Sequence, residues 1–345
     1  QHMNALVLET PCLFKYKSVP VPDIGDRDVL VRIHACGICG SDVHGMDGST
    51  GRRQPPIIMG HEAAGVIAAC GSEVTKWHAG DRVTFDSTLF CGTCPFCRTG
   101  RINLCNNRRV LGVSCDEYRC NGAFAEFAAV PEQSLFRLPD NLSFEQAAMV
   151  EALAIAVHAT GRHGVQLNDT AVVVGAGMIG LLLIQVLQVA GCGCVIAVDV
   201  DEGKLKLATA LGAAAAVNAD REDATAAVHA LTAGTGADLV FEAAGLTATV
   251  STALGAVRKG GAVTLVGNLA PTIEFPLQAA VTREVSLFGS CASAGEYPAC
   301  LDLIARSAVN VDHLISATAP LKDGASWFNR LYNREPGLMK VILIP

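Results

Sequence analysis

Short stretches in which hydrophobic and polar residues alternate characterise the first 150 residues of the chain. Residues 29–33 alternate in this way, and further strands are predicted at residues 64–69 and 124–130. A turn at residues 80–83 leads into another strand, and glycine and proline residues interrupt the pattern throughout. We therefore expect the N-terminal part to form a β-rich, barrel-like domain.

From Ser143 onward, predicted helices alternate with strands that are apolar along their whole length. Ser143 is expected to cap the first of these helices. The predicted strands are residues 170–174, 194–198, 216–217, 238–241 and 262–266, and the predicted helices are residues 178–190, 202–211, 224–233 and 247–257. Apolar strands that alternate with helices are typical of a parallel sheet covered on both faces. The expected fold class is α/β, with a doubly wound parallel-sheet domain.

The length of the chain predicts two domains. It has 345 residues, half of them hydrophobic, and chains of this size usually divide. The change of pattern places the parallel-sheet domain at residues 154–289. Residues 341–344 predict a last strand, so the chain is expected to return to the first domain, which would comprise residues 1–153 and 290–345.

Charge and hydropathy exclude two classes of partner. The formal net charge is −7 and no run of five basic residues occurs, which argues against a nucleic-acid partner. The longest apolar helix candidate, residues 178–190, is too short to span a bilayer, so no membrane partner is expected. No segment has the pattern of a signal peptide. A cytoplasmic protein is expected, with its fourteen cysteines reduced.

Four cysteines lie within fifteen residues, in a segment, residues 90–107, that shows no strand or helix pattern. They are Cys91, Cys94, Cys97 and Cys105. Thiolates gathered this closely in a long chain without a secretory signal suit a tetrahedral metal better than disulfides. A structural zinc at this segment would also explain how so long a loop becomes ordered.

A sparser set of residues suits a second, catalytic zinc, which takes about three protein ligands and leaves one position open. Its candidate ligands are Cys39, His61, Glu62 and Glu151, and either glutamate could supply the carboxylate. The open position would hold an alcohol oxygen, whose pKa the metal lowers. Ser41 and His44 could then carry the alcohol proton outward.

A glycine motif predicts a dinucleotide site, because it follows an apolar strand and opens a helix. Gly175 permits a tight turn, Gly177 lets the backbone approach a diphosphate, and Gly180 allows close packing of helix and strand. Asp199, at the end of the next strand, can accept hydrogen bonds from a ribose and would repel a 2′-phosphate, which favours NAD over NADP. Lys204 is a further candidate for contact with the ribose or phosphate.

These motifs closely resemble those of the zinc-dependent medium-chain dehydrogenases. The matching stretches are CGICGSDVH at residues 36–44, GHEAAG at residues 60–65, the cysteine cluster, GAGMIG at residues 175–180 and VIAVD at residues 195–199. The resemblance implies a GroES-like barrel domain interrupted by a Rossmann domain. It implies two zinc ions per chain, one catalytic and one structural, and a homodimer or homotetramer. It also places four residues near the cofactor: Ile179, Val266, Gly267 and Ser290.

Within that family, the segment EALAIAVH at residues 151–158 resembles the polyol branch, which includes sorbitol-type and galactitol-phosphate-type dehydrogenases. In that branch a glutamate, here Glu151, replaces a cysteine ligand. Three features depart from the sorbitol enzymes. Ala152 stands where proline is usual, Gly45 where an aromatic residue is usual, and no arginine follows Ser290.

The expected function is the transfer of a hydride from a secondary alcohol of a polyol to NAD⁺. The polyol could also be phosphorylated, with Arg52, Arg53 or Arg109 as candidate phosphate contacts. The same residues would suit an L-threonine or 2,3-butanediol dehydrogenase. A protein of a different class, an NAD-binding redox sensor or structural protein, would lack the catalytic ligands, whereas this chain has them all.

Overall fold

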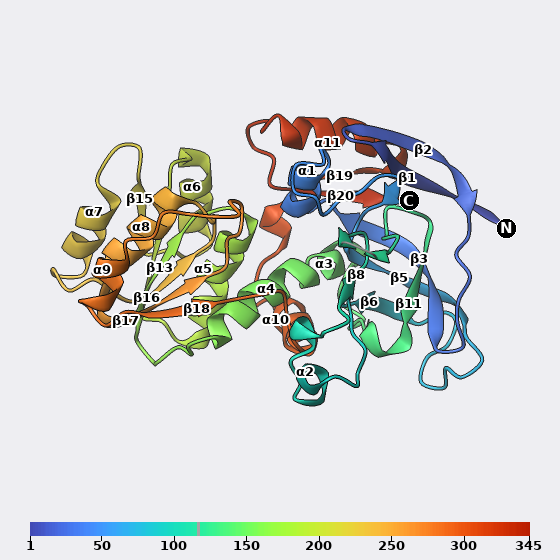
Figure 1. Cartoon of the computed structure of the whole chain (residues 1–345), viewed down its shortest axis with the longest axis horizontal. Coiled ribbons are helices and arrows are strands. Elements are labelled where there is room, and N and C mark those ends of the chain that lie inside the picture. Colours follow the sequence, from blue (N-terminus) through green and yellow to red (C-terminus); the bar gives the residue numbers. More distant parts are fainter. Residues whose placement is uncertain (116–117) are drawn as a thin grey trace. The chain divides into compact units, whose positions relative to one another are not determined.

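The computed structural model describes residues 1–115 and 118–345, which form two compact units (Figure 1). The first unit comprises Gln1–Glu151, Ala294–Arg306 and Val311–Pro345. The second comprises Ala152–Ser293 and Ser307–Asn310. Across the described residues, no helix is both long and apolar enough to cross a membrane.

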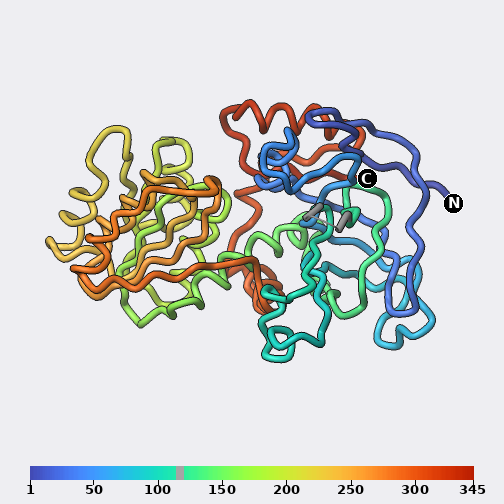
Figure 2. The backbone as a smooth tube through the Cα atoms, in the orientation of Figure 1, coloured from blue at the N-terminus to red at the C-terminus, as the bar shows by residue number. Residues whose placement is uncertain are grey.

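The first unit is built on a seven-stranded sheet in the order β12-β6-β5-β3-β20-β19, with β11 also paired to β3. The last strand of the chain pairs antiparallel with β3 through Ile342 and Leu343. Figure 2 shows this C-terminal segment beside the early strands of the unit. The strands are β3 (Asp28–Gly37), β5 (Glu62–Cys70), β6 (Arg82–Phe85), β11 (Phe127–Pro131), β12 (Leu135–Arg137), β19 (Ile315–Pro320) and β20 (Lys340–Ile344).

Smaller elements complete the first unit, and several were not predicted. Strands β1 (His2–Thr10), β2 (Leu13–Pro20) and β4 (Ile57–Ile58) form a second sheet. Two further strand pairs are β7 (Thr88–Leu89) with β8 (Arg109–Val110), and β9 (Ser114–Cys115) with β10 (Tyr118–Arg119). The helices are α1 (Gly40–Gly45), α2 (Pro95–Arg98), α3 (Phe144–Ala148), α10 (Tyr297–Ala305) and α11 (Gly324–Tyr332).

The segment at residues 90–107 corrects one expectation, because it is not devoid of regular structure. It contains α2 and a 3₁₀ turn at Ile102–Leu104. No residue of α2 is buried, so this short helix has no apolar face that could stabilise it by packing. Its order must come from elsewhere, and the cysteines around it are the available source.

The second unit is a parallel sheet of six strands in the order β15-β14-β13-β16-β17-β18. This is the order of a doubly wound Rossmann fold, with its topological switch point between β13 and β16. The α/β class is therefore confirmed. The strands are β13 (Thr170–Val174), β14 (Cys194–Asp199), β15 (Ala215–Asn218), β16 (Ala237–Glu242), β17 (Val257–Leu265) and β18 (Ser286–Gly289).

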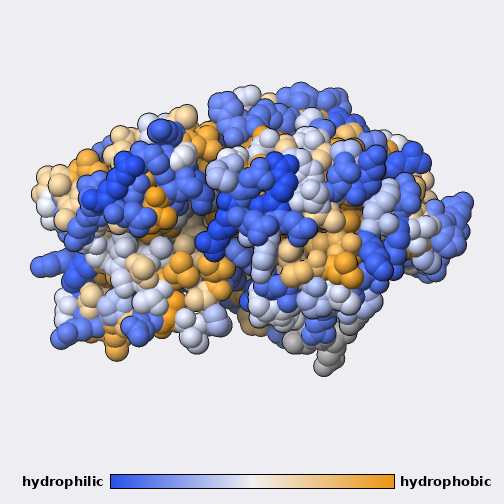
Figure 3. Space-filling view, turned by 90° about the horizontal axis from the view of Figure 1, so that it is seen from above, coloured by the Kyte–Doolittle hydropathy of each residue, from blue (hydrophilic) through white to orange (hydrophobic). Residues whose placement is uncertain are grey.

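The helices of the second unit pack in two groups, α5 with α6, and α7 with α8 and α9, as a sheet covered on both faces requires. Helix α5 ends because Gly191 adopts a left-handed conformation with φ of 108°. The helices are α5 (Met178–Ala190), α6 (Glu202–Ala210), α7 (Ala224–Leu231), α8 (Thr247–Ala256) and α9 (Leu277–Val281), while α4 (Val150–Gly161) begins in the first unit. On the face seen in Figure 3, hydrophobic side chains form patches among hydrophilic ones.

Candidate active site and metal centres

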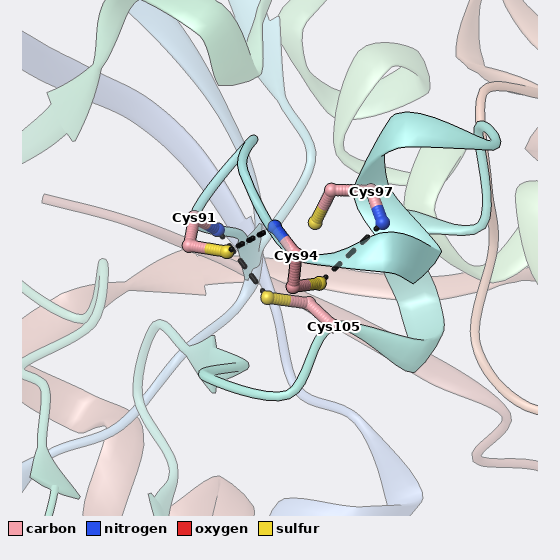
Figure 4. Close-up of side chains that lie close together, drawn as sticks. All are labelled: Cys91, Cys94, Cys97 and Cys105. Carbon is pink, nitrogen blue, oxygen red and sulfur yellow. Dashed lines mark hydrogen bonds between the residues drawn. The ribbon is translucent and has the colours of Figure 1, made fainter.

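The four clustered cysteines point their sulfur atoms toward one another (Figure 4), and all four lie within 4.8 Å of each other. The backbone amides of Cys91 and Asn107 donate to the Cys105 sulfur, each at 3.3 Å. The Cys94 amide donates to the Cys91 sulfur at 3.4 Å, and the Cys97 amide to the Cys94 sulfur at 3.5 Å. Amide donors stabilise thiolates, the form that binds metal. Four thiolates converging on one point fit a tetrahedral zinc.

A second group of donors comes from two segments of the first unit. Cys39 precedes α1, Glu62 begins β5, and His61 comes directly before that strand. The donor atoms of the three residues lie within 4.8 Å of one another. One sulfur, one nitrogen and one oxygen at this spacing fit a zinc with an open fourth position.

Gly60 explains how the chain brings His61 and Glu62 into this group. Its φ is +97°, a left-handed conformation that favours glycine. A Cβ atom there would lie 2.8 Å from the Cys36 sulfur and 2.9 Å from the Phe124 backbone nitrogen. The turn before β5 therefore requires glycine both for its conformation and for its close packing.

His61 is oriented by a buried carboxylate that sequence reasoning missed. Nδ1 of His61 lies 3.5 Å from Oδ1 of Asp42, and both side chains are buried. Burial alone would lower the pKa of His61, but Asp42 and Cys39 together raise it well above its usual value. A carboxylate behind a histidine ligand fixes the ring for metal binding. Asp42 lies inside the CGICGSDVH stretch, so its position next to the candidate ligands was the available signal.

Glu62 is held by a buried lysine from the far end of the chain. Nζ of Lys340 forms an ion pair with Oε2 of Glu62, and it also donates to the Ile38 carbonyl at 3.1 Å. Burial lowers the pKa of Lys340, but the charges of Glu62, Cys39 and Glu151 and the hydrogen bond to Glu62 together outweigh this, and the net shift is upward. The lysine is thus charged where it contacts Glu62. Nothing in the local sequence around Lys340 indicates this role.

Glu151 is not part of the three-residue group, although it is electrostatically coupled to it. Its Oε2 atom is buried and makes no hydrogen bond within the described residues. Burial raises the pKa of Glu151 to about 7, and the charge of Glu62 adds to this, while His61 and Lys340 oppose it. The structure therefore brings Cys39, His61 and Glu62 together and leaves Glu151 beside them with an unused carboxyl oxygen.

The two candidate proton carriers both lie in α1. The hydroxyl of Ser41 donates to the Cys39 sulfur at 3.3 Å, which puts it next to the candidate metal ligands. His44 lies one turn further along the same helix, and its side chain is exposed. A residue at the metal group and a residue at the solvent-accessible end suit the two ends of a proton path.

Two further buried groups lie in the same electrostatic environment and were not predicted. Asp86 is 3% exposed and accepts a hydrogen bond from the Thr88 amide at 2.8 Å. Burial raises the pKa of Asp86 from 3.8 to about 6. The hydroxyl of Tyr297 is fully buried without a hydrogen-bond partner in the described part of the chain. Burial, together with the charges of Asp86 and Glu151, raises its pKa well above 10.

The glycine motif of the second unit has the geometry that a diphosphate requires. Gly175 has φ of +99°, and a Cβ atom on Gly180 would collide with the Gly175 carbonyl oxygen. Gly177 caps α5, and the space around its Cα is open. The helix therefore presents free amide groups and its positive dipole end to whatever approaches the turn. The residues present fit a bound dinucleotide.

Asp199 lies at the end of β14 and contacts the glycine turn. Its Oδ2 atom accepts a hydrogen bond from the Ala176 amide at 2.7 Å, and Oδ1 accepts from the Val200 and Asp201 amides at 2.8 and 2.9 Å. The two hydrogen bonds to Oδ1 use both of its lone pairs, whereas Oδ2 accepts only one hydrogen bond and keeps a second lone pair. The side chain is thus fixed by the protein and still able to accept from a ribose.

The remaining predicted cofactor residues lie along the edge of the same unit. Lys204 lies in the first turn of α6, and Ile179 is the second residue of α5, within the glycine motif. The amides of Val266 and Gly267 donate to the Glu242 carbonyl at 2.9 and 3.0 Å, beyond the carboxyl end of β17. Ser290 follows β18, and its hydroxyl is buried without a hydrogen-bond partner among the described residues. These positions follow the carboxyl ends of their strands, where ligands bind in such sheets.

Comparisons with known proteins find matches in both units of the chain. Residues 25–140 match the model of the alcohol dehydrogenase GroES-like domain, and residues 179–306 match that of the zinc-binding dehydrogenase family. The chain is 33% identical to a sorbitol dehydrogenase of Bacillus subtilis, covering 100% of this chain and 98% of that one. It is 38% identical to an L-threonine 3-dehydrogenase of Symbiobacterium thermophilum over 77% of this chain and 75% of the relative.

Among solved structures, the galactitol-1-phosphate dehydrogenase of Escherichia coli has a TM-score of 0.92 against this chain. It is 29% identical, and the match covers 99% of this chain and 100% of that one. The similarity thus extends over both units and over all the motifs described above.

We expect that replacing Cys97 by Ser removes one of two zinc ions per chain, because three thiolates hold the structural metal much less tightly than four. Residues 90–107 should then become sensitive to limited proteolysis. Metal analysis and mass spectrometry of the fragments measure both effects. The exposed Cys12, replaced by Ser, serves as the control and should keep two zinc ions. Unchanged zinc content in the Cys97→Ser variant contradicts the assignment.

We expect that replacing Asp86 by Asn removes a pH-dependent cost to stability. The raised pKa means that the folded state holds a proton that the unfolded state has already lost between about pH 4 and 6. Stability therefore falls as the pH rises through this window, by about 2–3 kcal/mol. Urea unfolding of both proteins at pH 4.5 and 7 tests this: the advantage of the variant should grow with pH. The exposed Asp140, replaced by Asn, should show no such trend, and an equal difference at both pH values contradicts the prediction.

Proposed function

The chain belongs to the zinc-binding dehydrogenases with an alcohol dehydrogenase GroES-like domain, and from this we propose that it oxidises a secondary alcohol of a polyol with NAD⁺. The convergence of Cys39, His61 and Glu62, a set of three donors that suits a catalytic zinc, carries this proposal. The likeness to a sorbitol dehydrogenase over the whole chain supports the substrate class.

The reaction removes a hydride and a proton from the alcohol, giving a ketone, NADH and H⁺. When bound, zinc lowers the pKa of the alcohol and NAD⁺ accepts the hydride. Cys39, His61 and Glu62 would hold the metal, with Asp42 keeping His61 in its ligating orientation. Ser41 would accept the proton of the alcohol as it releases its own hydroxyl hydrogen toward His44, and His44 would pass a proton to solvent.

The buried oxygen of Glu151 supports a diol over a simple alcohol. An unpaired buried polar atom costs roughly 1–3 kcal/mol, and a hydroxyl on the carbon next to the reacting one would satisfy it. Glu151 would then bind the substrate, whereas the sequence had suggested it as a zinc ligand.

In the second unit, the glycine turn would hold the diphosphate. Asp199 would hold the ribose and exclude the 2′-phosphate of NADP.

A second candidate is the oxidation of L-threonine, which the 38% identity to a threonine dehydrogenase favours. A phosphorylated polyol finds support in the likeness to a galactitol-1-phosphate dehydrogenase. Arg53 is not available for its phosphate, because its guanidinium is buried against Asp42.

We further propose that the chain forms a homodimer or homotetramer through the edge of the second unit's sheet. Strand β18 ends the sheet, and three large hydrophobic residues nearby are exposed: Leu277, Val281 and Leu287. An exposed apolar edge of this kind suits pairing across a twofold axis. Sedimentation velocity that finds a single species of monomer mass contradicts this.

A cytoplasmic location is proposed on the chemistry of the two metal sites. Five of their ligands are cysteine thiolates, which a reducing compartment preserves. Cell fractionation that recovers the protein outside the cytoplasm contradicts this.

A panel of alcohols assayed for NADH production tests the proposed function. Sorbitol, xylitol, galactitol-1-phosphate, L-threonine and 2,3-butanediol form the panel, each with NAD⁺ and with NADP⁺. We expect the highest kcat/KM for an unphosphorylated polyol with NAD⁺, and at least a ~10-fold lower value with NADP⁺, since Asp199 repels the extra phosphate. A highest value for L-threonine would establish the second candidate. No turnover of any polyol by protein carrying two zinc ions would refute the proposal.

We expect that replacing His44 by Ala lowers kcat by ~10-fold or more and leaves two zinc ions bound, because His44 carries a proton and does not touch the metal. A high concentration of imidazole buffer should restore part of the rate. The exposed His78, replaced by Ala, is the control and should match the original protein. An unchanged kcat in the His44→Ala variant removes this residue from the proton path.

A further inference from the structure

Arg53 is a buried cation beside the candidate metal group, and it takes no part in the reaction steps given above. Its side chain is 2% exposed and that of Asp42, its ion-pair partner, is fully buried. A buried arginine normally has its donors committed to specific acceptors. The residues that accept hydrogen bonds from Arg53 therefore indicate its role.

The guanidinium of Arg53 contacts two neighbouring residues at once. Nη2 donates to Oδ1 of Asp42 at 2.7 Å and to Oγ of Ser41 at 3.3 Å. Nε also donates to Oδ1 of Asp42, at 3.2 Å, and Nη1 donates to the Arg52 carbonyl at 3.4 Å. One planar group therefore fixes the relative positions of a carboxylate and a hydroxyl, which the fork geometry of arginine makes possible.

Each of these two partners contacts a different candidate ligand. Oδ1 of Asp42 lies at an ion-pair distance of 3.5 Å from Nδ1 of His61, which makes no hydrogen bond within the described residues, and Ser41 donates its hydroxyl hydrogen to the Cys39 sulfur at 3.3 Å. Arg53 occupies one lone pair of the Ser41 oxygen, so the position of the hydroxyl is fixed while its second lone pair stays available to accept a hydrogen bond. Arg53 therefore acts on each candidate ligand through one intervening residue, on His61 through Asp42 and on Cys39 through Ser41.

Gly45 makes the space that Arg53 fills. A Cβ atom at position 45 would lie 2.6 Å from Cγ of Arg53 and 3.5 Å from its Cβ. A large side chain at this position and the present conformation of Arg53 exclude each other.

We propose that Arg53 is a positioning residue that sets two groups with one guanidinium, the His61 ring through Asp42 and the Ser41 hydroxyl directly. Gly45 is the residue that permits this arrangement. The part that concerns metal binding is independent of the substrate. The part that concerns proton transfer from the substrate rests on the proposed function.

Cobalt binding tests the first part without any turnover. Co²⁺ is titrated into protein from which the catalytic metal has been removed and the structural zinc kept, and the visible spectrum is recorded. Arg53→Met should weaken cobalt binding by ~10-fold or more and shift the d–d bands, because the partner of the histidine ligand is released. Arg137→Met, which removes a bidentate ion pair with Asp81 elsewhere in the same unit, is the control and should leave both unchanged.

Two further variants keep this test decisive if Arg53→Met does not fold. Arg53→Lys keeps the charge beside Asp42 but cannot bridge to Ser41. Its affinity for cobalt should lie within about threefold of that of the unsubstituted protein, because the charge is kept. The absorption band of the cobalt–sulfur bond should nevertheless change, because Ser41 is no longer held. Gly45→Leu should reproduce the weaker binding of Arg53→Met, because it displaces the guanidinium. If the folded variants bind cobalt with the same affinity and give the same spectra as the unsubstituted protein, the proposal is overturned.

A double-mutant cycle tests the second part with the polyol and NAD⁺. Arg53→Lys should lower kcat with little change in KM, and it should have no further effect in a Ser41→Ala background, because both changes remove the same positioned hydroxyl. Independent, multiplicative effects on kcat overturn the role of Arg53 in proton transfer. If the original protein oxidises no polyol, the proposed function fails, and the cobalt titration still decides whether Arg53 positions His61.

Discussion

Buried charge is the constraint on which the organisation of the first unit depends. Asp42 and Glu62 are both removed from water, and a buried carboxylate without a partner is strongly destabilising. Each has its own buried cation, Arg53 for Asp42 and Lys340 for Glu62. The two ion pairs flank the group formed by Cys39, His61 and Glu62. They balance the charge of two buried carboxylates, one of which, Glu62, is a candidate metal ligand.

The need to pair Glu62 with a cation involves the C-terminal strand of the chain in the site. Lys340 is the first residue of β20, which pairs with β3. The residues of the second unit lie between these two strands in the sequence. The pairing of Leu343 with Cys36 and of Ile342 with Gly37 brings the lysine to Glu62. A side chain on Gly37 would collide with the Glu62 carboxylate, so the strand leaves room for that contact. The closing strand is therefore part of the site as well as of the sheet.

Local signals could be read from the sequence, whereas these long-range pairs could not. Ser143 and Gln146 form the capping box that begins α3, and the apolar run Thr170–Val174 is a strand with those bounds. The four cysteines meet because their spacing is short. By contrast, 278 residues separate Lys340 from Glu62, and a single lysine carries no pattern that would indicate its partner. Strand β2 was missed for a different reason: only Phe14 among its residues is buried, so the strand has no regular alternation of buried and exposed positions.

The second unit satisfies its carboxylates differently, and the difference bears on the choice of cofactor. Asp199 accepts hydrogen bonds from three backbone amides, and Glu242 accepts from the amides of Ala244 and Gly245 at 2.9 and 2.8 Å. Amides stabilise a carboxylate through their dipoles but contribute no net charge. The negative charge of Asp199 is thus held in place at the glycine turn without being neutralised by these contacts. A ribose with two hydroxyls can donate to it, whereas a 2′-phosphate would be repelled, which supports the proposed preference for NAD⁺.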